Sequence, residues 1–480
     1  MEVFHFSAEC YPAAKAGGLG DVVGSLPKYF NRLDSNATVV MPAYQTEWLV
    51  QQPFEIVFKS QAPLGDEYFE FEVRHLYDAE LGFPLYTIHI PGRFDRAGIY
   101  VDPESGHGYW DELERFVSFQ IAGLDWIKSF DHVPDLFHCH DHHTALIPFM
   151  MTQCYRYDML ASKPTLVTIH NGQYHGEHHM NKYHLLPPFD LTHAGLLEWN
   201  DKLNSLATGI KCAWMVSTVS QSYMKELSVE SKGLEDLIAS EWQKTTGVVN
   251  GIDVEVWDPA RDPLIEHNFT YDELEEGKTE NKKILCQEFD LDPTLPTISF
   301  IGRLVAEKGA DLLPNLINHF GSNGENVNFI ILGTGEPSLH KVFNKMKSSY
   351  VGFFDARLEY NEKLAHQIYA GSDFMIMPSR VEPCGLNQMY AMRYATVPIV
   401  RAIGGLKDTV IDIDDEDGYG ITFSEFSLDM AVESVERSIN FYEDQEQFRQ
   451  NRKKLVSLDF SWERSAQSYK EIYERLINKT

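Results

Sequence analysis

Short apolar runs alternate with longer helical patterns along this chain, and the alternation occurs twice. In the first half the apolar runs span residues 3–6, 37–40, 85–90, 136–138, 166–169 and 215–219. From residue 297 the rhythm restarts, and each run is followed by a glycine or proline turn and a helical pattern; these runs span 298–301, 327–332, 374–377 and 398–400. Such alternation is typical of parallel sheets covered by helices. We therefore expect an α/β protein with two doubly wound, Rossmann-like domains.

The length of the chain and one polar stretch predict where the two domains divide. At 480 residues the chain is too long for a single hydrophobic core. The stretch 253–280 is polar and acidic, which predicts a connector and surface segment rather than a site. We therefore expect one domain at 1–250 and a second at 251–460.

The last stretch of the chain has a one-sided apolar pattern. The residues on this face are Trp462, Ala466, Tyr469, Tyr473 and Leu476. Their spacing is that of an amphipathic helix whose apolar face packs against something large. We expect a terminal helix within 461–480 that returns to the N-terminal domain.

Composition excludes several classes of partner. The formal charge is 41 − 71 = −30, which repels nucleic acid and anionic membranes, so clustered lysine and arginine are informative. The six cysteines show no paired metal spacing, and free thiols at this density favour a reducing compartment. No apolar run approaches the roughly 18 residues of a membrane span, and a strand beginning at Glu2 leaves no room for a signal or transit peptide. We expect a cytoplasmic protein without nucleic-acid or membrane partners, and the oligomeric state, a homo-oligomer included, stays open.

A lysine and several glycines follow the first predicted strand. The segment 15–27 contains Lys15, Gly17 and Gly18 and predicts a loop that leads into a helix. Glycine lets backbone N–H groups approach an oxyanion, and a helix N-terminus adds a positive end, so the segment predicts phosphate binding. A tight turn is the alternative. A similar run at 404–408 echoes it in the second half, and two such loops facing each other would form a cleft between the domains.

Two cations follow the first predicted strand of the second half. Arg303 and Lys308 stand five residues apart, just after that strand ends at Gly302. A planar guanidinium and a compact ammonium suit a diphosphate whose charge grows as it leaves. The alternative is a pair of solvated surface cations.

The segment 374–388 has the same design of strand, sharp loop and helix. Glu382 precedes the helix, and the N–H groups of Gly385, Leu386 and Asn387 are free to receive a phosphate. A carboxylate beside an anion site is costly, so we expect Glu382 to have a chemical task. A carboxylate stabilised by the helix dipole is the alternative.

Histidines cluster at 138–143 and 170–179. A binuclear metallohydrolase would need a His-x-His-x-Asp-His spacing, which Asp141 breaks because it directly follows His140. Asp141 and His170 each follow an apolar strand, so we expect them to bind sugar hydroxyls. Asn250, at the domain junction, is either part of a plain turn or a ligand contact.

Taken together, these segments resemble the bacterial and plant glycogen/starch synthase family, which are retaining α-1,4-glucosyltransferases of the GT-B fold. The matching motifs occur in family order over nearly the whole chain: Lys-x-Gly-Gly-Leu-Gly-Asp at 15–21, His-Asp at 140–141, His-Asn at 170–171, Asn-Gly-Ile-Asp at 250–253, Gly-Arg at 302–303 with Lys308, and Glu-Pro-Cys-Gly-Leu at 382–386.

The resemblance implies an acceptor-binding N-terminal domain and a nucleotide-sugar-binding C-terminal domain. The implied donor is a nucleoside diphosphate glucose, usually ADP-glucose, and the acceptor is the non-reducing end of an α-1,4-glucan such as glycogen or a maltooligosaccharide. No metal or other cofactor is implied, because Arg303 and Lys308 would stabilise the departing ADP. An Asp-x-Asp metal motif is not expected at 290–292, which follows a helical pattern, or at 412–414, which lies in an acidic run.

The resemblance also assigns roles to single residues. The catalytic group would be Glu382, Arg303, Lys308, His170 and Asp141. The donor-binding group would be Lys15, Gly17, Gly18, Asp21, Asn250, Cys384, Gly385, Leu386 and Asn387. Tyr100 would bind the acceptor, although a core tyrosine fits its position almost as well. Retention fits a front-face route, and a covalent double displacement, which needs two carboxyl groups about 5 Å apart, stays open.

This sequence departs from the family pattern at Ala16, His142 and Ala395, where Thr, Ser or Val, then Trp, then Gly are customary. None of these changes removes a charged catalytic group, but they put acceptor fit and donor-base preference in doubt. The alternatives are a UDP-glucose-dependent glucan synthase, a metallohydrolase built on the histidine clusters, and a non-catalytic glucan-binding scaffold.

Overall fold

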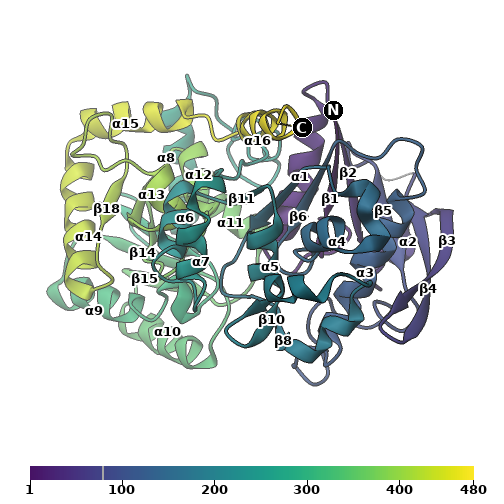
Figure 1. Ribbon diagram of the computed structural model, residues 1–480. Helices are drawn as coiled ribbons and strands as arrows, with labels where there is room; N and C mark the ends of the chain where they lie inside the picture. The colour runs from purple at the N-terminus through teal and green to yellow at the C-terminus, as the bar shows by residue number, and fades with distance from the viewer. Residues whose placement is uncertain (78–79, 480) are drawn as a thin grey trace. The chain divides into compact units, whose positions relative to one another are not determined.

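The computed structural model describes residues 1–77 and 80–479 (Figure 1). The chain divides into two compact units. Unit 1 comprises Met1–Val248 and Trp462–Thr480, and unit 2 comprises Val249–Ser461. Each unit has its own central sheet, as the two-fold alternation of apolar runs predicts.

The described strands of unit 1 form a nine-stranded sheet in the order β12-β11-β7-β6-β1-β2-β5-β4-β3. Their bounds are β1 Glu2–Phe6, β2 Asn36–Pro42, β3 Glu55–Leu64, β4 Glu67–His75, β5 Leu85–His89, β6 Leu136–His140, β7 Thr165–Ile169, β11 Met215–Thr218 and β12 Thr245–Gly247. All six predicted runs are strands, and their neighbours pair in parallel. The antiparallel hairpin of β3 and β4 at the sheet edge was not expected, because its outer strand is mostly exposed and its one short apolar run, at 56–58, is followed by polar residues.

The described strands of unit 2 form a six-stranded parallel sheet in the order β15-β14-β13-β16-β17-β18. Their bounds are β13 Thr297–Ile301, β14 Asn328–Leu332, β15 Phe354–Arg357, β16 Phe374–Met377, β17 Val397–Arg401 and β18 Ile421–Phe423. The four predicted strands are confirmed. A small sheet in unit 1 contains β8 Glu177–His179, β9 Glu198–Trp199 and β10 Lys202–Asn204.

Helices connect the strands of both sheets. Those of unit 1 are α1 Gly18–Asn31, α2 Glu47–Gln51, α3 Glu112–Ile127, α4 Ile147–Gln153, α5 Ser205–Cys212, α6 Gln221–Leu227, α7 Glu235–Ser240 and α16 Trp462–Ile477. Those of unit 2 are α8 Leu274–Glu288, α9 Leu313–Asn323, α10 Pro337–Ser349, α11 Glu362–Gly371, α12 Asn387–Arg393, α13 Gly404–Thr409, α14 Leu428–Glu443 and α15 Gln445–Ser457. Short 3₁₀ turns occupy Tyr155–Leu160, Met180–Leu185, Leu191–Leu196, Trp242–Lys244 and Ala306–Lys308. Within residues 1–77 and 80–479, no helix combines the length and apolar character needed to cross a membrane.

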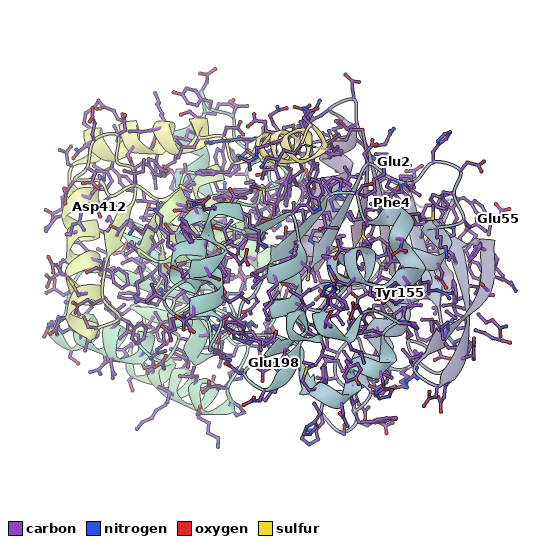
Figure 2. The ribbon with its side chains drawn as sticks, viewed as in Figure 1. Glu2, Phe4, Glu55, Tyr155, Glu198 and Asp412 are labelled. Carbon is purple, nitrogen blue, oxygen red and sulfur yellow. The ribbon has the colours of Figure 1, made fainter. Side chains whose placement is uncertain are left out.

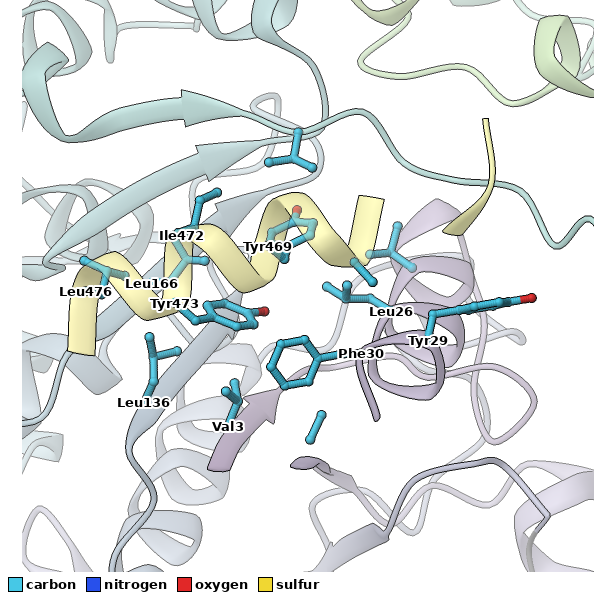
Figure 3. Close-up of a cluster of buried hydrophobic side chains, with 14 of the residues drawn as sticks. Val3, Leu26, Tyr29, Phe30, Leu136, Leu166, Tyr469, Ile472, Tyr473 and Leu476 are labelled. Carbon is cyan, nitrogen blue, oxygen red and sulfur yellow. The ribbon is translucent and has the colours of Figure 1, made fainter. Parts of the chain in front are cut away.

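The terminal helix α16 packs against the sheet of unit 1, as predicted (Figure 3). Tyr473 is fully buried, and its ring meets Phe30 of α1 edge-on at 5.2 Å between centroids. Val3 of β1 and Leu136 of β6 belong to the same cluster. Burying large apolar side chains of this kind contributes roughly 1.5–3 kcal/mol each, which explains why the helix docks on this unit.

The glycine-rich segment 15–27 is helical over most of its length, so its prediction as a loop was wrong. Helix α1 begins at Gly18 and continues through Pro27. Proline inside a helix leaves the carbonyl four residues earlier without its usual donor. Here Cys10 Sγ donates to that carbonyl, Val23 O, at 3.6 Å, so the chain tolerates the proline.

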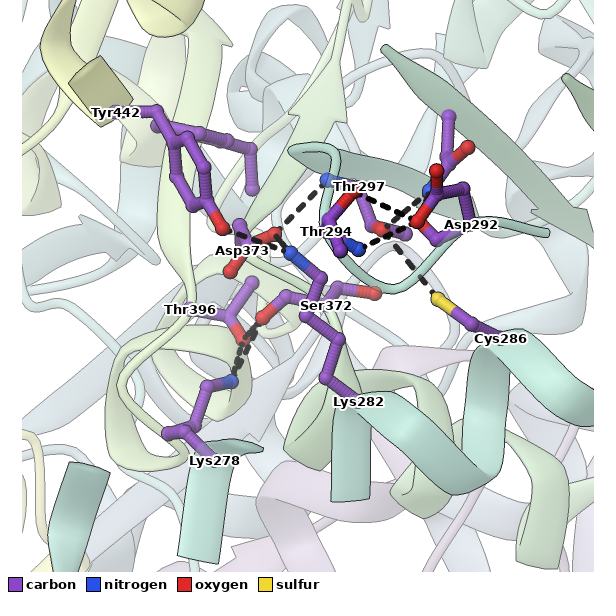
Figure 4. Close-up of polar contacts among 12 residues, drawn as sticks. Lys278, Lys282, Cys286, Asp292, Thr294, Thr297, Ser372, Asp373, Thr396 and Tyr442 are labelled. Atoms are coloured by element: carbon purple, nitrogen blue, oxygen red, sulfur yellow. Dashed lines mark hydrogen bonds and ion pairs between the residues drawn. The ribbon is translucent and has the colours of Figure 1, made fainter. Parts of the chain in front are cut away.

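The stretch 253–280 is not simply a surface connector, which corrects a second prediction. Helix α8 begins at Leu274, and its Lys278 is buried. Lys278 Nζ donates to Ser372 O and to Thr396 Oγ1, both at 2.7 Å (Figure 4). A buried lysine amino group requires such acceptors, so the acidic composition of the stretch conceals a helix that belongs to the core of unit 2.

A second buried polar contact in Figure 4 holds the strand that leads to Glu382. Asp373, just before β16, accepts from Lys282 Nζ of α8 and from Arg452 of α15, both at 2.6 Å. These cations hold the pKa of the Asp373 carboxyl below its usual value even though burial opposes them. Helices α8 and α15 are thereby fixed to the base of β16.

Candidate active site

In unit 1, two candidate residues follow neighbouring parallel strands. Asp141 comes directly after β6, and His170 comes directly after β7. The backbone N–H of His170 donates to Asp141 Oδ1 at 2.7 Å. Asp141 has a left-handed backbone conformation with φ 55°, so the chain turns sharply where β6 ends. The structure therefore brings these two predicted residues together.

Burial sets the protonation of both groups. It raises the pKa of Asp141 to about 7, although the N–H of His170 and the nearby His142 oppose the shift. It lowers the pKa of His170 to about 3, so this imidazole is neutral at physiological pH. A carboxyl that titrates near neutrality beside a neutral imidazole can exchange hydrogen bonds with hydroxyl groups.

A buried carboxylate, Glu9, organises the glycine segment. Its Oε2 accepts from the backbone N–H groups of Ala16 at 2.6 Å and Gly17 at 2.9 Å, and its Oε1 accepts from Tyr100 OH at 2.6 Å. The amide of Gly17 is thus occupied by a side chain, which corrects the expectation that it is free for a phosphate. The ring of Tyr100 also stacks on His143 at 4.8 Å, so the hydroxyl and one ring face of this acceptor candidate are engaged.

Lys15 and Asp21, both expected at the donor, form an ion pair at 2.6 Å. Their side chains are 45% and 34% exposed, so the pair is accessible to a competing anion. A Cβ atom placed on Gly17 or Gly18 would meet nothing within 4 Å. The space beside the first turn of α1 is therefore open, and it adjoins the positive end of a helix.

A polar pocket of about 360 Å³ lies beside His142, one of the departures from the family pattern. Its lining consists of Glu112, His142, Gln173, Tyr174, His175, Gly176, Glu177 and Lys232. His142 Nε2 lies 3.4 Å from Glu112 Oε1. Tyr174 is 64% exposed, so it presents a ring face next to hydrogen-bonding groups, the combination that suits a sugar.

In unit 2, Lys308 and Glu382 form a partly buried ion pair. Lys308 Nζ donates to Glu382 Oε1 at 2.7 Å and Oε2 at 2.8 Å, and Ser379 OH donates to Oε2 at 2.9 Å. The Glu382 side chain is 7% exposed and that of Lys308 is 23% exposed. Two predicted catalytic residues are thus in direct contact, and every described contact to the carboxylate fixes its orientation.

The residue after Lys308 is Gly309, and no side chain would fit at its position. Gly309 has φ 70°, and a Cβ atom there would lie 2.0 Å from Pro378 O. Glycine at this position therefore allows the 3₁₀ turn that carries Lys308 to lie against the end of β16.

Arg303 has a different environment from its predicted partner Lys308. Its side chain is 65% exposed, and it pairs with Glu307 at 3.5 Å. Among the described residues, no contact joins Arg303 to the pair of Lys308 and Glu382. Arg303 is therefore a largely exposed cation just after the end of β13, in a weak ion pair that an incoming ligand can displace.

The start of α12 lies beside the end of β13. Asn387 begins the helix, and its Nδ2 donates to Ile301 O at 2.7 Å. Leu386 is the N-cap residue and offers no side-chain cap. Gly385 has φ 73°, which favours glycine. The three predicted phosphate-binding amides thus lie at a helix start whose N-cap residue, Leu386, makes no side-chain cap bond to the described residues.

Cys384 and Asn250 are also brought together. Burial raises the pKa of the Cys384 thiol to about 12, although a hydrogen bond from the backbone of Asn250 opposes this effect. The thiol is therefore not a nucleophile at neutral pH. Asn250 Oδ1 is buried and has no hydrogen-bond partner among the described residues, so it is available to accept from a ligand.

Carboxylates of the two Asp-x-Asp pairs have partners within the protein. Asp292 accepts from the N–H of Thr294 at 2.8 Å (Figure 4). Asp412, labelled in Figure 2, accepts from Arg437 at 2.5 Å, and this arginine helps to lower the pKa of its carboxyl. Each of these two aspartates thus has a structural role.

Two groups of side chains in the described part of the chain have metal-type ligand atoms within 4.8 Å of one another. They are His5 with His138 and His140, and Glu112 with His142 and His143. In the first group His138 bonds through one nitrogen to Tyr473 OH at 2.7 Å and through the other to Thr168 Oγ1 at 2.6 Å. These bonds give His138 a role in the core of unit 1 without a metal ion.

Comparisons with known proteins identify the family of the chain. Residues 2–240 match the family described as "Starch synthase catalytic domain", and residues 281–455 match "Glycosyl transferases group 1". A glycogen synthase of Flavobacterium johnsoniae is 48% identical and is covered over 100% of both chains. A glycogen synthase of Streptococcus gordonii is 34% identical, with 99% of this chain and 100% of its own covered.

Two solved structures share the fold. The catalytic domain of Starch Synthase IV from Arabidopsis thaliana, bound to ADP and acarbose, superposes with a TM-score of 0.85 at 30% identity and 99% coverage of both chains. Sucrose-phosphate synthase from Thermosynechococcus elongatus superposes with a TM-score of 0.60 at 15% identity and 100% coverage of both chains, which shows the fold alone. On these matches the chain belongs to the glycogen/starch synthase family, the GT-B glycosyltransferases that transfer glucose to a glucan.

Proposed function

We propose that this enzyme transfers glucose from ADP-glucose, with retention, to the non-reducing end of an α-1,4-glucan. The observation that carries the proposal is the ion pair of Lys308 and Glu382 at the loop before α12. It holds a carboxylate and an ammonium at fixed positions, one suited to positive charge on the sugar and the other to negative charge on the leaving diphosphate. The ADP in the related plant structure supports adenine as the donor base.

The two domains would divide the substrates. Residues 1–250 with 461–480 would bind the acceptor glucan, and residues 251–460 would bind the nucleotide sugar. The polar pocket beside His142 and the exposed ring of Tyr174 in its lining support the first assignment. A glucan needs hydroxyl partners and flat apolar surfaces, and both are present there.

Phosphate binding would come from cations and helix starts. Arg303 and Lys308 would neutralise the diphosphate, and the amides of residues 385–387 would contact its oxygens. Lys15, with the open first turn of α1 at Gly18, would offer a second anion site. Positive helix ends and flexible cations are the groups that bind phosphate without a metal.

A front-face route fits the chemistry of Glu382 better than covalent catalysis. Both carboxylate oxygens accept hydrogen bonds from Lys308, and one also accepts from Ser379. These bonds lower the nucleophilicity of Glu382 but leave its negative charge near the sugar. Asp141 and His170 would hold hydroxyls of the transferred glucose, and the departing phosphate would take the proton of the incoming hydroxyl.

The test compares ADP-glucose and UDP-glucose as donors, with glycogen as primer, in the wild type and three variants. Lys308→Ala and Glu382→Ala should each lower kcat about 100-fold or more. Lys345→Ala, which removes an exposed lysine on α10, is the matched control and should transfer glucose normally.

Each part of the proposal has its own contrary result. Equal kcat in Lys308→Ala, Glu382→Ala and the control would overturn the site. Faster transfer from UDP-glucose would overturn the donor assignment. A β-configured product, detected by the ¹H NMR signal of the new anomeric proton on a maltooligosaccharide, would overturn retention.

A further inference from the structure

Three buried histidines form a hydrogen-bonded chain that runs from His170 into the sheet of unit 1. His170 Nε2 lies 3.0 Å from His140 Nδ1, and His140 Nε2 lies 3.1 Å from His5 Nδ1. The three residues come from neighbouring parallel strands, since His170 follows β7, His140 ends β6 and His5 is within β1. His5 and His140 are fully buried, and His170 is 8% exposed.

All three rings are neutral, and neutrality fixes how their protons are arranged. Burial lowers the pKa of His5 and of His170 to about 3, and it lowers that of His140 well below the ordinary value. A neutral imidazole has one N–H and one bare nitrogen. Every N–H in the chain must therefore point the same way, either toward His170 or toward His5.

The inner end of the chain decides between the two directions. His5 Nε2 is buried and has no hydrogen-bond partner among the residues that the structure describes. If the protons pointed inward, this nitrogen would carry an orphaned N–H, and buried N–H groups without an acceptor are rarer than unpaired acceptors. The favoured state leaves His5 Nε2 bare, so His5 donates to His140 and His140 donates to His170.

The outer end of the chain is where a ligand could be bound. No described residue accepts from or donates to His170 Nδ1, and this nitrogen is not among the buried unpartnered atoms. With its Nε2 occupied as an acceptor, the single proton of His170 is on Nδ1. The exposed edge of His170 is then a hydrogen-bond donor.

We propose that His5 and His140 are positioning residues that hold His170 as the Nδ1–H tautomer, which donates to an oxygen of the bound sugar. The sugar contact rests on the proposed function, whereas the tautomer is a property of the free enzyme. The same arrangement explains why two histidines with no access to solvent occupy β1 and β6, where apolar side chains would otherwise fill the core.

The experiment uses the full chain with ¹⁵N-labelled histidine. The ¹⁵N shifts and the one-bond N–H couplings identify the protonated nitrogen of His170, whose signals are assigned by their loss in His170→Asn. The wild type should carry the proton on Nδ1, and neutron diffraction of the wild-type crystal gives the same information without any variant. A proton on Nε2 of His170 in the wild type would overturn the proposal.

Variants separate positioning from packing. His140→Leu removes the donor to His170 and should give a mixture of both tautomers with about a 10-fold loss in kcat/KM. His140→Asn keeps an N–H near the position of Nδ1 and should restore the Nδ1–H tautomer and most of the activity. His138→Leu, an equally buried change off the chain, should lower thermal stability without changing the tautomer.

The outcomes distinguish this proposal from the proposed function. If His140→Leu left the His170 tautomer unchanged, positioning by the chain would be wrong even if activity fell. If His170 became a mixture of both tautomers in His140→Leu while kcat/KM stayed at the wild-type value, positioning of His170 by the histidine chain would be supported. The sugar contact of His170 within the proposed function would then be wrong.

Discussion

Replacing Asp141 by asparagine should stabilise the protein more at pH 8 than at pH 5. Burial raises the pKa of this carboxyl to about 7, so ionisation above that pH opposes folding. In the wild type the N–H of His170 donates to Asp141 Oδ1 at 2.7 Å, and an asparagine keeps an oxygen that can accept this hydrogen bond. It also suits the left-handed backbone at φ 55°. The substitution therefore removes the cost of the charge and little else.

The sign and size of the effect follow from linkage. Because the folded pKa of about 7 lies above the ordinary value of 3.8, the folded state binds more protons between these values. The carboxyl's contribution is complete below about pH 4 and is lost as the pH rises through 7. Each pH unit between 5 and 7 lowers the free energy of unfolding of the wild type by about 1.4 kcal/mol. The upper limit for the loss of stability between pH 5 and pH 8 is therefore about 2.7 kcal/mol.

Partial exposure of Asp141 reduces this limit, and we expect about 1–2 kcal/mol between pH 5 and pH 8. At about 1–2 °C for each kcal/mol in a chain of this length, the gain in Tm from Asp141→Asn should be roughly 1–4 °C larger at pH 8 than at pH 5. Differential scanning calorimetry of both proteins at both pH values measures it. Asp201→Asn is the control, because Asp201 also has a positive φ of 62° but is exposed. An equal change in Tm at both pH values would refute the reasoning.

Three further predictions address the charges and the core. Lys308→Met should lower the free energy of unfolding by about 3 kcal/mol, because it leaves Glu382 buried without its cation, and adding Glu382→Gln should recover most of the loss; additive losses in calorimetry would contradict the ion pair. Tyr473→Phe removes the hydroxyl that bonds to His138 at 2.7 Å, so it should lower the free energy of unfolding by about 1–2 kcal/mol and leave the KM for the donor unchanged. A higher KM for the donor would argue against a purely structural role. Glucose transfer should continue at full rate in excess chelator, and a loss that added Mg²⁺ or Zn²⁺ reverses would disprove the metal-free assignment.

The sequence reveals the buried strands of this fold because parallel strands covered on both faces are continuous apolar runs. β7, for example, is buried at every residue. The edge hairpin of β3 and β4 has such a run only at 56–58, because most of its residues face solvent on one side or at the sheet edge. β15 and β18 have four and three residues, which is too short for a periodic pattern to stand out.

The candidate site was predictable where a residue directly follows a strand. Asp141 and His170 fit this rule, and the structure joins them through a backbone hydrogen bond. The partner of each group could not be read from the sequence, because pairing depends on the packed structure. Glu9 does not directly follow β1, which ends at Phe6, so the rule does not point to it, and nothing local shows that its carboxylate accepts from the amide of Gly17.

The cations assigned to the diphosphate each have a carboxylate partner in the free protein, and the exposure of these pairs predicts how they respond to a donor. The pairs of Lys15 with Asp21 and of Arg303 with Glu307 have side chains at least 34% exposed. Exposed pairs of this kind are worth about 0–1 kcal/mol, so a diphosphate can displace the carboxylates at little cost.

Lys308 cannot exchange partners in the same way, because Glu382 is only 7% exposed and would become an uncompensated buried charge. In the proposed function Lys308 would therefore remain with Glu382 while it contacts the donor through its remaining N–H. As the glycosidic bond breaks, positive charge grows on the sugar and negative charge grows on the phosphate. In the proposed function the pair would place one fixed charge of the opposite sign toward each, so its contribution would be larger in the transition state than in the bound substrate, which is the condition for catalysis rather than mere binding.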